Sequence, residues 1–220
     1  MPIIFKFLKT DKISKSFLNF LRSKWFFLFI NSLKKLLDES NLFLEWYLPK
    51  YVKRRKNRIL KIKFNKIFKK LLNNIYYKNK VFVHRDFHIS NLMITKKGLG
   101  LIDSQDAVYG NIAYDLASLI DDVRFKTDTK TKNFIFDEFI KKNKKINLKK
   151  FKNDFEILSV LRNLKIIGIF TRLSVRDKKN KYLKLIPHAW ELINYRALNN
   201  PIFKDLNYLL SKNFDRKIRK

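Results

Sequence analysis

Apolar residues recur at helical spacing through the first third of the chain. Between residues 16 and 39 they fall three or four positions apart, and Ser14 or Ser16 can cap the start, which predicts an amphipathic helix. Helical spacing also covers residues 42–52, where Pro49 interrupts it, and residues 62–77. None of these segments alternates between apolar and polar residues as a half-buried strand does, so we expect residues 1–80 to be helical.

The pattern changes at Val81. Short apolar runs at residues 81–83, 92–94 and 99–102 predict three strands, and Lys96-Lys97-Gly98 predicts the turn between the last two. This is the part of the chain where strands are expected.

Helical spacing then returns for the rest of the chain. Helices are predicted over residues 112–123, 134–142 and 148–173, and after Pro187 and Pro201. Residues 155–170 are apolar on most sides apart from Glu156, Arg162 and Lys165. We therefore expect this stretch to be the central buried helix.

Length and composition set the class of protein. At 220 residues with 46% hydrophobic residues, the chain is long and apolar enough to bury a core, which excludes wholesale disorder. The absence of cysteine excludes a disulfide scaffold, thiolate zinc sites and cysteine nucleophiles.

The chain is strongly basic, with 50 Lys and Arg against 19 Asp and Glu. The net charge of +31, with clusters at residues 53–56 and 141–145, is compatible with binding to nucleic acid or to an anionic membrane surface. However, Lys, Asn, Ile and Phe are enriched together, as an AT-rich genome would produce on any solvated surface, and no zinc-finger, helix-turn-helix or RNP pattern accompanies the charge. Both explanations stay open.

No segment predicts a membrane span. The most apolar stretch, residues 25–30, extends to residue 37 only with polar interruptions and falls short of the roughly 20 apolar residues that a spanning helix needs. Charged residues also interrupt any signal-peptide core near the start. We expect a soluble, cytoplasmic protein.

The residues that carry chemistry lie between residues 84 and 103. The segment His84-Arg85-Asp86-Phe87-His88-Ile89-Ser90-Asn91 is followed by Leu101-Ile102-Asp103. Phosphoryl transfer to an alcohol requires a carboxylate that accepts the proton of the alcohol, here Asp86. It also requires hard oxygen ligands that hold Mg²⁺ against the phosphates, here Asn91 and Asp103.

These residues resemble the aminoglycoside phosphotransferase family. The pattern H-R-D-x-x-x-x-N followed by a strand-end Asp is similar to the catalytic loop of kinase-like folds. His88 and the segments Ile102-Asp103-Ser104-Gln105-Asp106-Ala107 and Tyr114-Asp115-Leu116-Ala117 narrow the resemblance to this family. Within the family, the chain is most similar to bacterial kinases of N-acetylmuramate or N-acetylglucosamine, with weaker likeness over residues 42–172.

The resemblance implies a role for each matching residue. Asp86 would be the catalytic base, Asn91 and Asp103 the ligands of Mg²⁺, and ATP the phosphoryl donor to a sugar or amino-sugar hydroxyl. The residues that would support the loop are His84, His88, Asp106 and Asp115. Ser104 departs from the apolar residue that the family usually has there, and no acceptor-binding residue is assigned.

Simpler interpretations exist for single residues. A lone H-x-D is more often a capped turn than a catalytic site, and Asp115 alone would suit the N-terminal end of any helix. Glu45 and Trp46 could line a substrate cleft, but amphipathic packing explains them as well. The joint match of seven polar residues favours the family.

The implied fold is α+β, mainly α, and corresponds to the large, C-terminal lobe of a protein-kinase-like fold. Residues 1–80 and 104–220 would be its helical parts, and residues 81–103 a small β-hairpin carrying the catalytic loop. The N-terminal β lobe is expected to be absent, because no glycine precedes Gly98 and no strand-rich stretch precedes Val81. The chain would then be a truncated or degenerate relative, and a separately encoded N-terminal lobe is a candidate partner.

Two other functions compete with this one. A non-catalytic module could keep the fold and use its basic surface on nucleic acid or an anionic membrane. A protein kinase is disfavoured, because His88 is present and Ser104-Gln105 stands where that family has Phe-Gly.

The purified 220-residue chain is predicted to be a very poor kinase. Without a second lobe, the nucleotide is held from one side, and orientation alone can contribute about 7–11 kcal/mol to catalysis. Steady-state turnover of ATP with an amino sugar checks this prediction. Rates in the ordinary kinase range of about 1–100 per second would contradict it.

Overall fold

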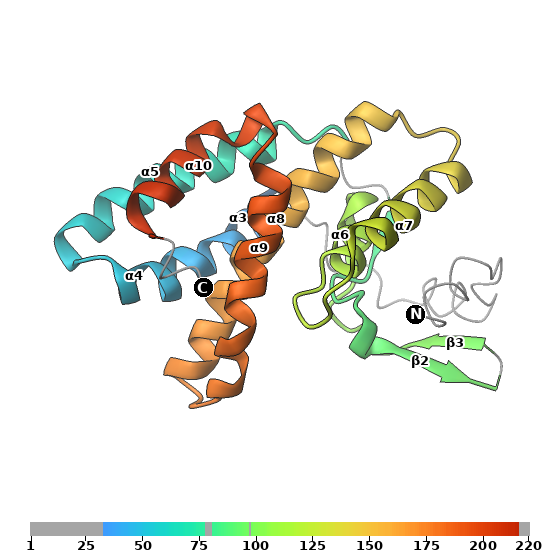
Figure 1. The fold of residues 1–220 in the computed structure, drawn as a ribbon, viewed down its shortest axis with the longest axis horizontal. Helices are drawn as coiled ribbons and strands as arrows, with labels where there is room; N and C mark the ends of the chain where they lie inside the picture. The colour runs from blue at the N-terminus through green and yellow to red at the C-terminus, as the bar shows by residue number, and fades with distance from the viewer. Residues whose placement is uncertain (1–32, 78–80, 97, 216–220) are drawn as a thin grey trace.

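The computed structural model describes residues 33–77, 81–96 and 98–215. Helices dominate this part of the chain, and two small antiparallel sheets complete it (Figure 1). This composition fits the predicted α+β, mainly α class. Residues 16–32 of the first predicted helix and Lys97 of the predicted turn lie outside the described residues.

The first described helices are more continuous than predicted. Helix α3 (Leu33–Leu42) runs through a π-helical turn, η2 (Phe43–Tyr47), into α4 (Leu48–Tyr51). The prediction that Pro49 interrupts this region was wrong. Pro49 lies in the first turn of α4, directly after the π-helical turn, and the helical path continues past it.

Helix α5 (Arg54–Asn73) begins before the predicted residue 62 and ends before the predicted residue 77. Its first turns are basic and polar, so they carry no apolar periodicity, although Arg and Lys are good helix formers. At its end, the carboxylate of Asp154 accepts the backbone N–H groups of Tyr76 at 2.9 Å and Tyr77 at 2.7 Å. These bonds draw the chain away from the helix axis.

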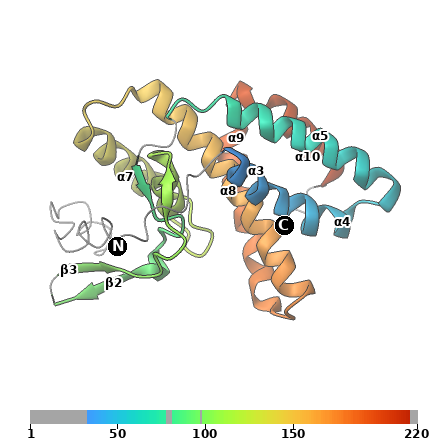
Figure 2. The ribbon, with the colours of Figure 1, turned by 180° about the vertical axis from the view of Figure 1, so that it is seen from behind.

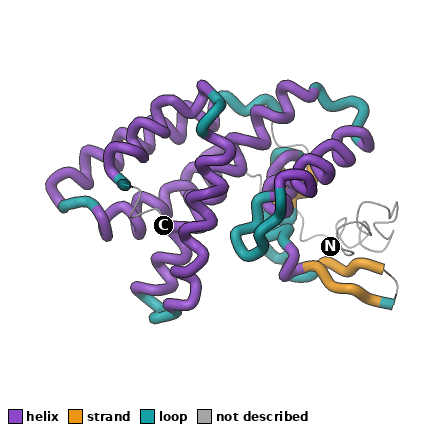
Figure 3. The backbone as a smooth tube through the Cα atoms, in the orientation of Figure 1, coloured by secondary structure: helices purple, strands orange, loops and turns teal. Residues whose placement is uncertain are grey.

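The strands form two separate sheets. β1 (Val81–Val83) pairs with β4 (Val108–Gly110). β2 (Leu92–Thr95) pairs with β3 (Gly98–Leu101) in the orange hairpin of Figure 3. The three predicted strands are confirmed, and β4 was missed because three residues are too few to show a period. The expectation of one hairpin over residues 81–103 was wrong, since β1 pairs with β4 rather than with its neighbour in sequence.

The remaining helices follow the predicted order. They are α6 (Ala113–Ile120), α7 (Thr129–Lys142), α8 (Leu148–Val175), η4 (Asn180–Leu185), α9 (Ile186–Ala197), η5 (Pro201–Phe203) and α10 (Lys204–Asn213). α7 begins before the predicted residue 134, because Asp128 caps it by accepting the N–H of Thr131 at 2.8 Å. Among the described residues, no helix combines the length and apolar character needed to cross a bilayer.

α8 is the central helix that the sequence predicts. From Phe155 to Phe170 its side chains are buried except for the half-buried Glu156 and Ile169. It packs against α3, η2, α6 and α9, and in Figure 2 it runs through the middle of the molecule. A Cβ on Gly168 would lie only 2.4 Å from the backbone of Leu42, so α3 can approach α8 this closely only because the residue is glycine.

A cluster of four aromatic side chains forms another part of the core. The rings of Phe43, Tyr47, Trp190 and Phe214 contact one another at centroid distances of 5.2–6.0 Å. The indole N–H of Trp190 also donates to the hydroxyl of Tyr47 at 3.1 Å. This cluster joins η2, α9 and the end of α10.

Asp121 connects four helices at the end of α6. Its buried carboxylate accepts from Lys132 Nζ of α7 at 2.6 Å, from Ser159 Oγ of α8 at 2.6 Å, and from Arg196 Nε of α9 at 2.8 Å. Burial alone would raise the pKa of Asp121, but Arg196 and Lys132 outweigh burial and hold the pKa below its ordinary value of 3.8. The carboxylate is therefore ionised at neutral pH.

We predict that Asp121→Asn lowers the free energy of unfolding by about 3–5 kcal/mol at pH 7, because it leaves two buried cations without their anion. Since the pKa of Asp121 is lowered by folding, this stabilisation is complete above pH 3.8 and is lost as the pH falls through the folded-state pKa. Urea denaturation at pH 7 and pH 3 measures both effects. The exposed Asp137→Asn on α7 is the control, and equal stability of the two variants at pH 7 would refute the prediction.

Candidate active site

Residues 84–91 form a loop that connects the two sheets. His84 follows β1 directly, and a 3-10 turn, η3 (Ile89–Asn91), leads into β2 (Figure 1). The loop therefore joins the β1–β4 sheet to the projecting β2–β3 hairpin. All residues predicted for catalysis and metal binding lie in this loop or just after β3.

The carboxylate of Asp115 on α6 holds the start of the loop. Its two oxygens accept the backbone N–H groups of His84 at 2.6 Å and Arg85 at 2.9 Å. Arg85 has a φ of 73°, a left-handed conformation that is unfavourable for a residue with a side chain. The two hydrogen bonds stabilise this conformation, which turns the chain sharply just before Asp86.

Burial raises the pKa of Asp115 to about 6, against the opposing effect of the two N–H donors. The carboxylate is ionised at neutral pH, the form in which both oxygens can accept. Below that pKa it takes up a proton, and its hold on the loop weakens.

Asn91 is bonded to the backbone of Asp86. The carbonyl oxygen of Asp86 accepts from the side-chain Nδ2 of Asn91 at 2.9 Å and from the backbone N–H of His88 at 3.0 Å. Since the amide nitrogen of Asn91 is engaged, its Oδ1 atom is the one with which it would bind a cation. That oxygen belongs to the hard class of ligand that Mg²⁺ prefers.

The pairing of β2 with β3 brings the segment before Asp103 alongside the backbone of Asn91. Leu92 pairs with Leu101, and the backbone N–H of Ile102 donates to the carbonyl of Asn91 at 3.1 Å. Asp103 follows at once, with a φ of 68° and an exposed side chain that accepts a hydrogen bond from Gln105. The two predicted magnesium ligands are thus close along the backbone: Asn91 is bonded to Ile102, and Asp103 is the next residue.

His84 connects the start of the loop to Ile102, the residue before Asp103. Its Nε2 lies 3.0 Å from the carbonyl oxygen of Ile102, and since that oxygen can only accept, Nε2 carries the hydrogen. The ring is buried and contacts Phe87 edge-on. His84 therefore links the start of the loop to the residue before Asp103.

Arg85 ties the loop to α3 and α8 through a residue that sequence reasoning missed. Its guanidinium bonds to Glu39, whose other carboxylate oxygen accepts from Tyr114 Oη at 3.1 Å and Lys165 Nζ at 3.3 Å. Burial would raise the pKa of Glu39, but Lys165 and Arg85 outweigh it and lower the pKa. Nothing local in the sequence pairs Glu39 with Arg85, since 46 positions separate them.

Asp106 supports the loop through its backbone. Its carbonyl accepts from Arg85 Nη1 at 3.1 Å, while its side chain is exposed. This contact does not depend on the residue being aspartate.

His88 is surrounded by charged groups. It is buried, and its Nδ1 atom has no hydrogen-bond partner. Burial and then Arg124 lower the pKa of His88, and Asp122, Arg162 and Asp86 also act on it. The imidazole is therefore neutral at pH 7, close to Asp86.

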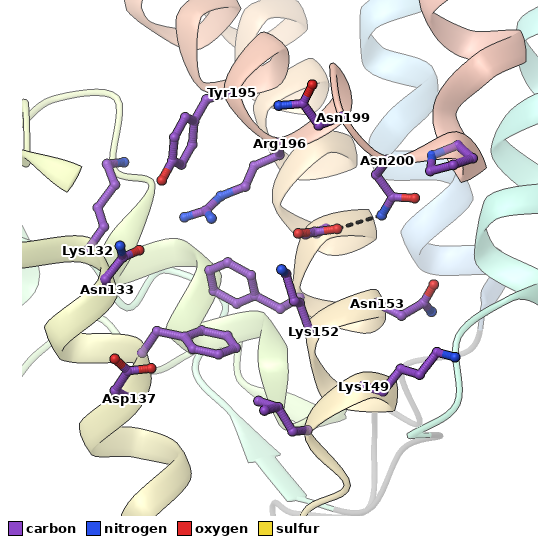
Figure 4. A pocket seen from close by; sticks show the side chains of 15 residues that line it. Lys132, Asn133, Asp137, Lys149, Lys152, Asn153, Tyr195, Arg196, Asn199 and Asn200 are labelled. Carbon is purple, nitrogen blue, oxygen red and sulfur yellow. Dashed lines mark hydrogen bonds between the residues drawn. The ribbon is translucent and has the colours of Figure 1, made fainter. Parts of the chain in front are cut away.

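A separate hollow of about 770 Å³ opens between α7, the start of α8 and the end of α9. Figure 4 shows Lys132, Asn153 and Arg196 among the side chains that line it. None of the predicted site residues lines this hollow. Among the described residues, no group of three or more His, Asp or Glu side chains is placed to hold a metal ion.

Comparison with known proteins shows which family the chain resembles. The model of the phosphotransferase enzyme family matches residues 29–137, which include the whole loop and the hairpin. A protein of Neisseria meningitidis named N-acetylmuramate/N-acetylglucosamine kinase is 36% identical over 169 residues, covering 73% of this chain and 49% of that protein.

Proteins of the same name from two other bacteria also match. The one from Pseudomonas aeruginosa is 29% identical over 80% of this chain and 54% of its own length, and the one from Caulobacter vibrioides is 32% identical over 50% and 32%. The chain spans about half the length of the curated relatives that match most of it. From the family match and these relatives, we conclude that the chain belongs to the phosphotransferase enzyme family.

Proposed function

We propose that this chain binds ATP and Mg²⁺ and transfers the terminal phosphoryl group of ATP to a hydroxyl of a sugar or amino sugar. The observation that carries the proposal is a set of backbone bonds: Asn91 accepts the N–H of Ile102, the residue before Asp103, and the side-chain amide of Asn91 donates to the carbonyl of Asp86. One carboxylate beside two oxygen ligands is the set of groups that phosphoryl transfer to an alcohol requires.

Asp86 is the catalytic base in this proposal. Its carboxylate accepts the hydroxyl proton of the sugar while the sugar oxygen bonds to phosphorus and the bond from phosphorus to ADP breaks. The sharp turn at Arg85 and the two bonds to the carbonyl of Asp86 fix the backbone from which this carboxylate projects. The residue therefore needs little reorganisation to act.

Asn91 and Asp103 are the metal ligands in this proposal. When bound, Mg²⁺ would neutralise charge on the phosphate oxygens. Asn91 is 9% exposed and held at its amide nitrogen, whereas Asp103 is exposed. Asn91 would therefore be the more buried of the two ligands, whereas the carboxylate of Asp103 is exposed and accepts a hydrogen bond from Gln105.

The proposed acceptor class comes from the relatives. The proteins from Neisseria meningitidis and Pseudomonas aeruginosa are named for two N-acetylated amino sugars. We extend that class to this chain because the matches cover most of its described residues, including the central helix α8.

Asp86→Asn tests the proposal. The amide keeps the shape of the carboxylate but cannot take the proton, so we expect formation of phosphosugar to fall about 10²- to 10⁴-fold. A radiometric assay with labelled ATP, Mg²⁺ and N-acetylglucosamine, run for hours, measures the slow rate of the wild-type chain and its loss. Binding of a fluorescent ATP analogue should stay unchanged, which shows that the variant is folded.

Asp137→Asn, on the exposed face of α7, is the control and should keep the wild-type rate. A wild-type chain that forms no phosphosugar above background, or an Asp86→Asn variant with the wild-type rate, would contradict the proposal.

A further inference from the structure

Helix α5 concentrates the positive charge of the chain. Nine of its 20 residues are Lys or Arg and none is Asp or Glu, whereas the whole chain has 50 Lys and Arg and 19 Asp and Glu in 220 residues. The share of cations in α5 is therefore about twice that of the chain. A uniform compositional bias would spread the cations more evenly than this.

The exposed residues of α5 share one side of the helix. On the other side, Leu60, Phe64 and Phe68 are buried against the core. At 3.6 residues per turn, the exposed residues between positions 55 and 70 fall within an arc of about 160°. We call this side the outer face of α5, and its residues are Arg55, Lys56, Arg58, Ile59, Ile62, Lys63, Lys66, Lys69 and Lys70.

The cations of the outer face have few anions near them. In the part of the chain that the structure describes, the one ion pair of this face joins Lys70 Nζ to Asp205 of α10, at 2.9 Å. Arg55 and Arg58 are three positions apart, as are Lys63 and Lys66, and like charges at this spacing destabilise a helix. An anionic partner would offset this repulsion.

Two exposed isoleucines lie among these cations. Ile59 is 57% exposed and Ile62 is 65% exposed. The phosphate backbone of a nucleic acid binds cations but offers an isoleucine little contact. At a membrane surface, by contrast, cations are attracted to anionic headgroups while apolar side chains enter the boundary of the acyl region. The combination therefore favours a membrane over a nucleic acid.

We propose that the outer face of α5 binds the surface of an anionic phospholipid membrane. Its Lys and Arg side chains contact the headgroups, and Ile59 and Ile62 insert between them. The buried side of α5 stays packed on the core, so this is peripheral binding that leaves the fold intact. None of these residues belongs to the proposed catalytic or metal-binding set, so the inference does not depend on the proposed function.

Co-sedimentation of the full chain with lipid vesicles tests the proposal. The vesicles contain phosphatidylcholine alone, or phosphatidylcholine with about 30% phosphatidylglycerol, in about 0.15 M salt. We expect binding to the anionic vesicles only. The combined variant Arg55→Gln, Lys63→Gln and Lys66→Gln should bind them about 100-fold more weakly, since each basic residue at such a surface contributes about fivefold in affinity.

A matched control removes the same charge elsewhere. The combined variant Lys179→Gln, Lys181→Gln and Lys184→Gln changes three exposed lysines in or just before η4. In Figures 1 and 2 this turn lies at the lower end of α8 and α9, whereas α5 lies along the upper edge of the molecule. The control should bind anionic vesicles within about twofold of the wild type, because charges farther from the membrane than about 8 Å are largely screened.

The combined variant Ile59→Gln and Ile62→Gln separates a membrane from a nucleic acid. It should weaken binding to the anionic vesicles at least about tenfold, because it removes the apolar insertion. Any binding to duplex DNA should stay unchanged, since the cations remain. All the substituted residues are exposed, and an unchanged melting temperature shows that each variant is folded.

Three results would overturn the proposal. They are a wild-type chain that does not bind the anionic vesicles, an equal loss of binding in the α5 and η4 lysine variants, and wild-type binding by the isoleucine variant. In the last case, tight and salt-sensitive binding of duplex DNA would assign the outer face to nucleic acid instead. None of these results bears on phosphoryl transfer, which Asp86→Asn tests separately.

Discussion

The site depends on one carboxylate that accepts two backbone N–H groups. Asp115 reaches from α6 to His84 and Arg85 and stabilises the left-handed turn at Arg85 that precedes the proposed base. β1 and the hairpin are in different sheets, so the loop between them has no strand ladder of its own. Its shape comes instead from side chains: Asp115 at the start, Asn91 at the end, and Glu39 through Arg85.

Two buried carboxylates each compensate two cations in the described part of this basic chain. Glu39 serves Arg85 and Lys165, and Asp121 serves Lys132 and Arg196, in each case joining helices far apart in sequence. With only 19 acidic residues in the chain, each such anion has several cations to satisfy. Arg162 differs from these cations, because its Nε and Nη1 atoms have no hydrogen-bond partner.

The sequence predicted what local patterns determine. Residues 155–170 were identified as the buried helix because they are apolar on most sides, and the loop residues because their types and spacing resemble the family pattern. β4 and the start of α5 were missed, since one is three residues long and the other begins with polar residues that show no period. Glu39 and Asp122 were missed for a different reason, because their importance comes from tertiary neighbours that no spacing reveals.

Binding of Mn²⁺ in place of Mg²⁺ tests most directly whether the hairpin forms a metal site. Titration followed by electron paramagnetic resonance, with an ATP analogue present, compares the wild type with Asp103→Asn and with the distant control Asp137→Asn. Our account predicts one site in the wild type and in the control, and an affinity lower by at least about tenfold in Asp103→Asn. Equal Mn²⁺ affinity in all three proteins would contradict it.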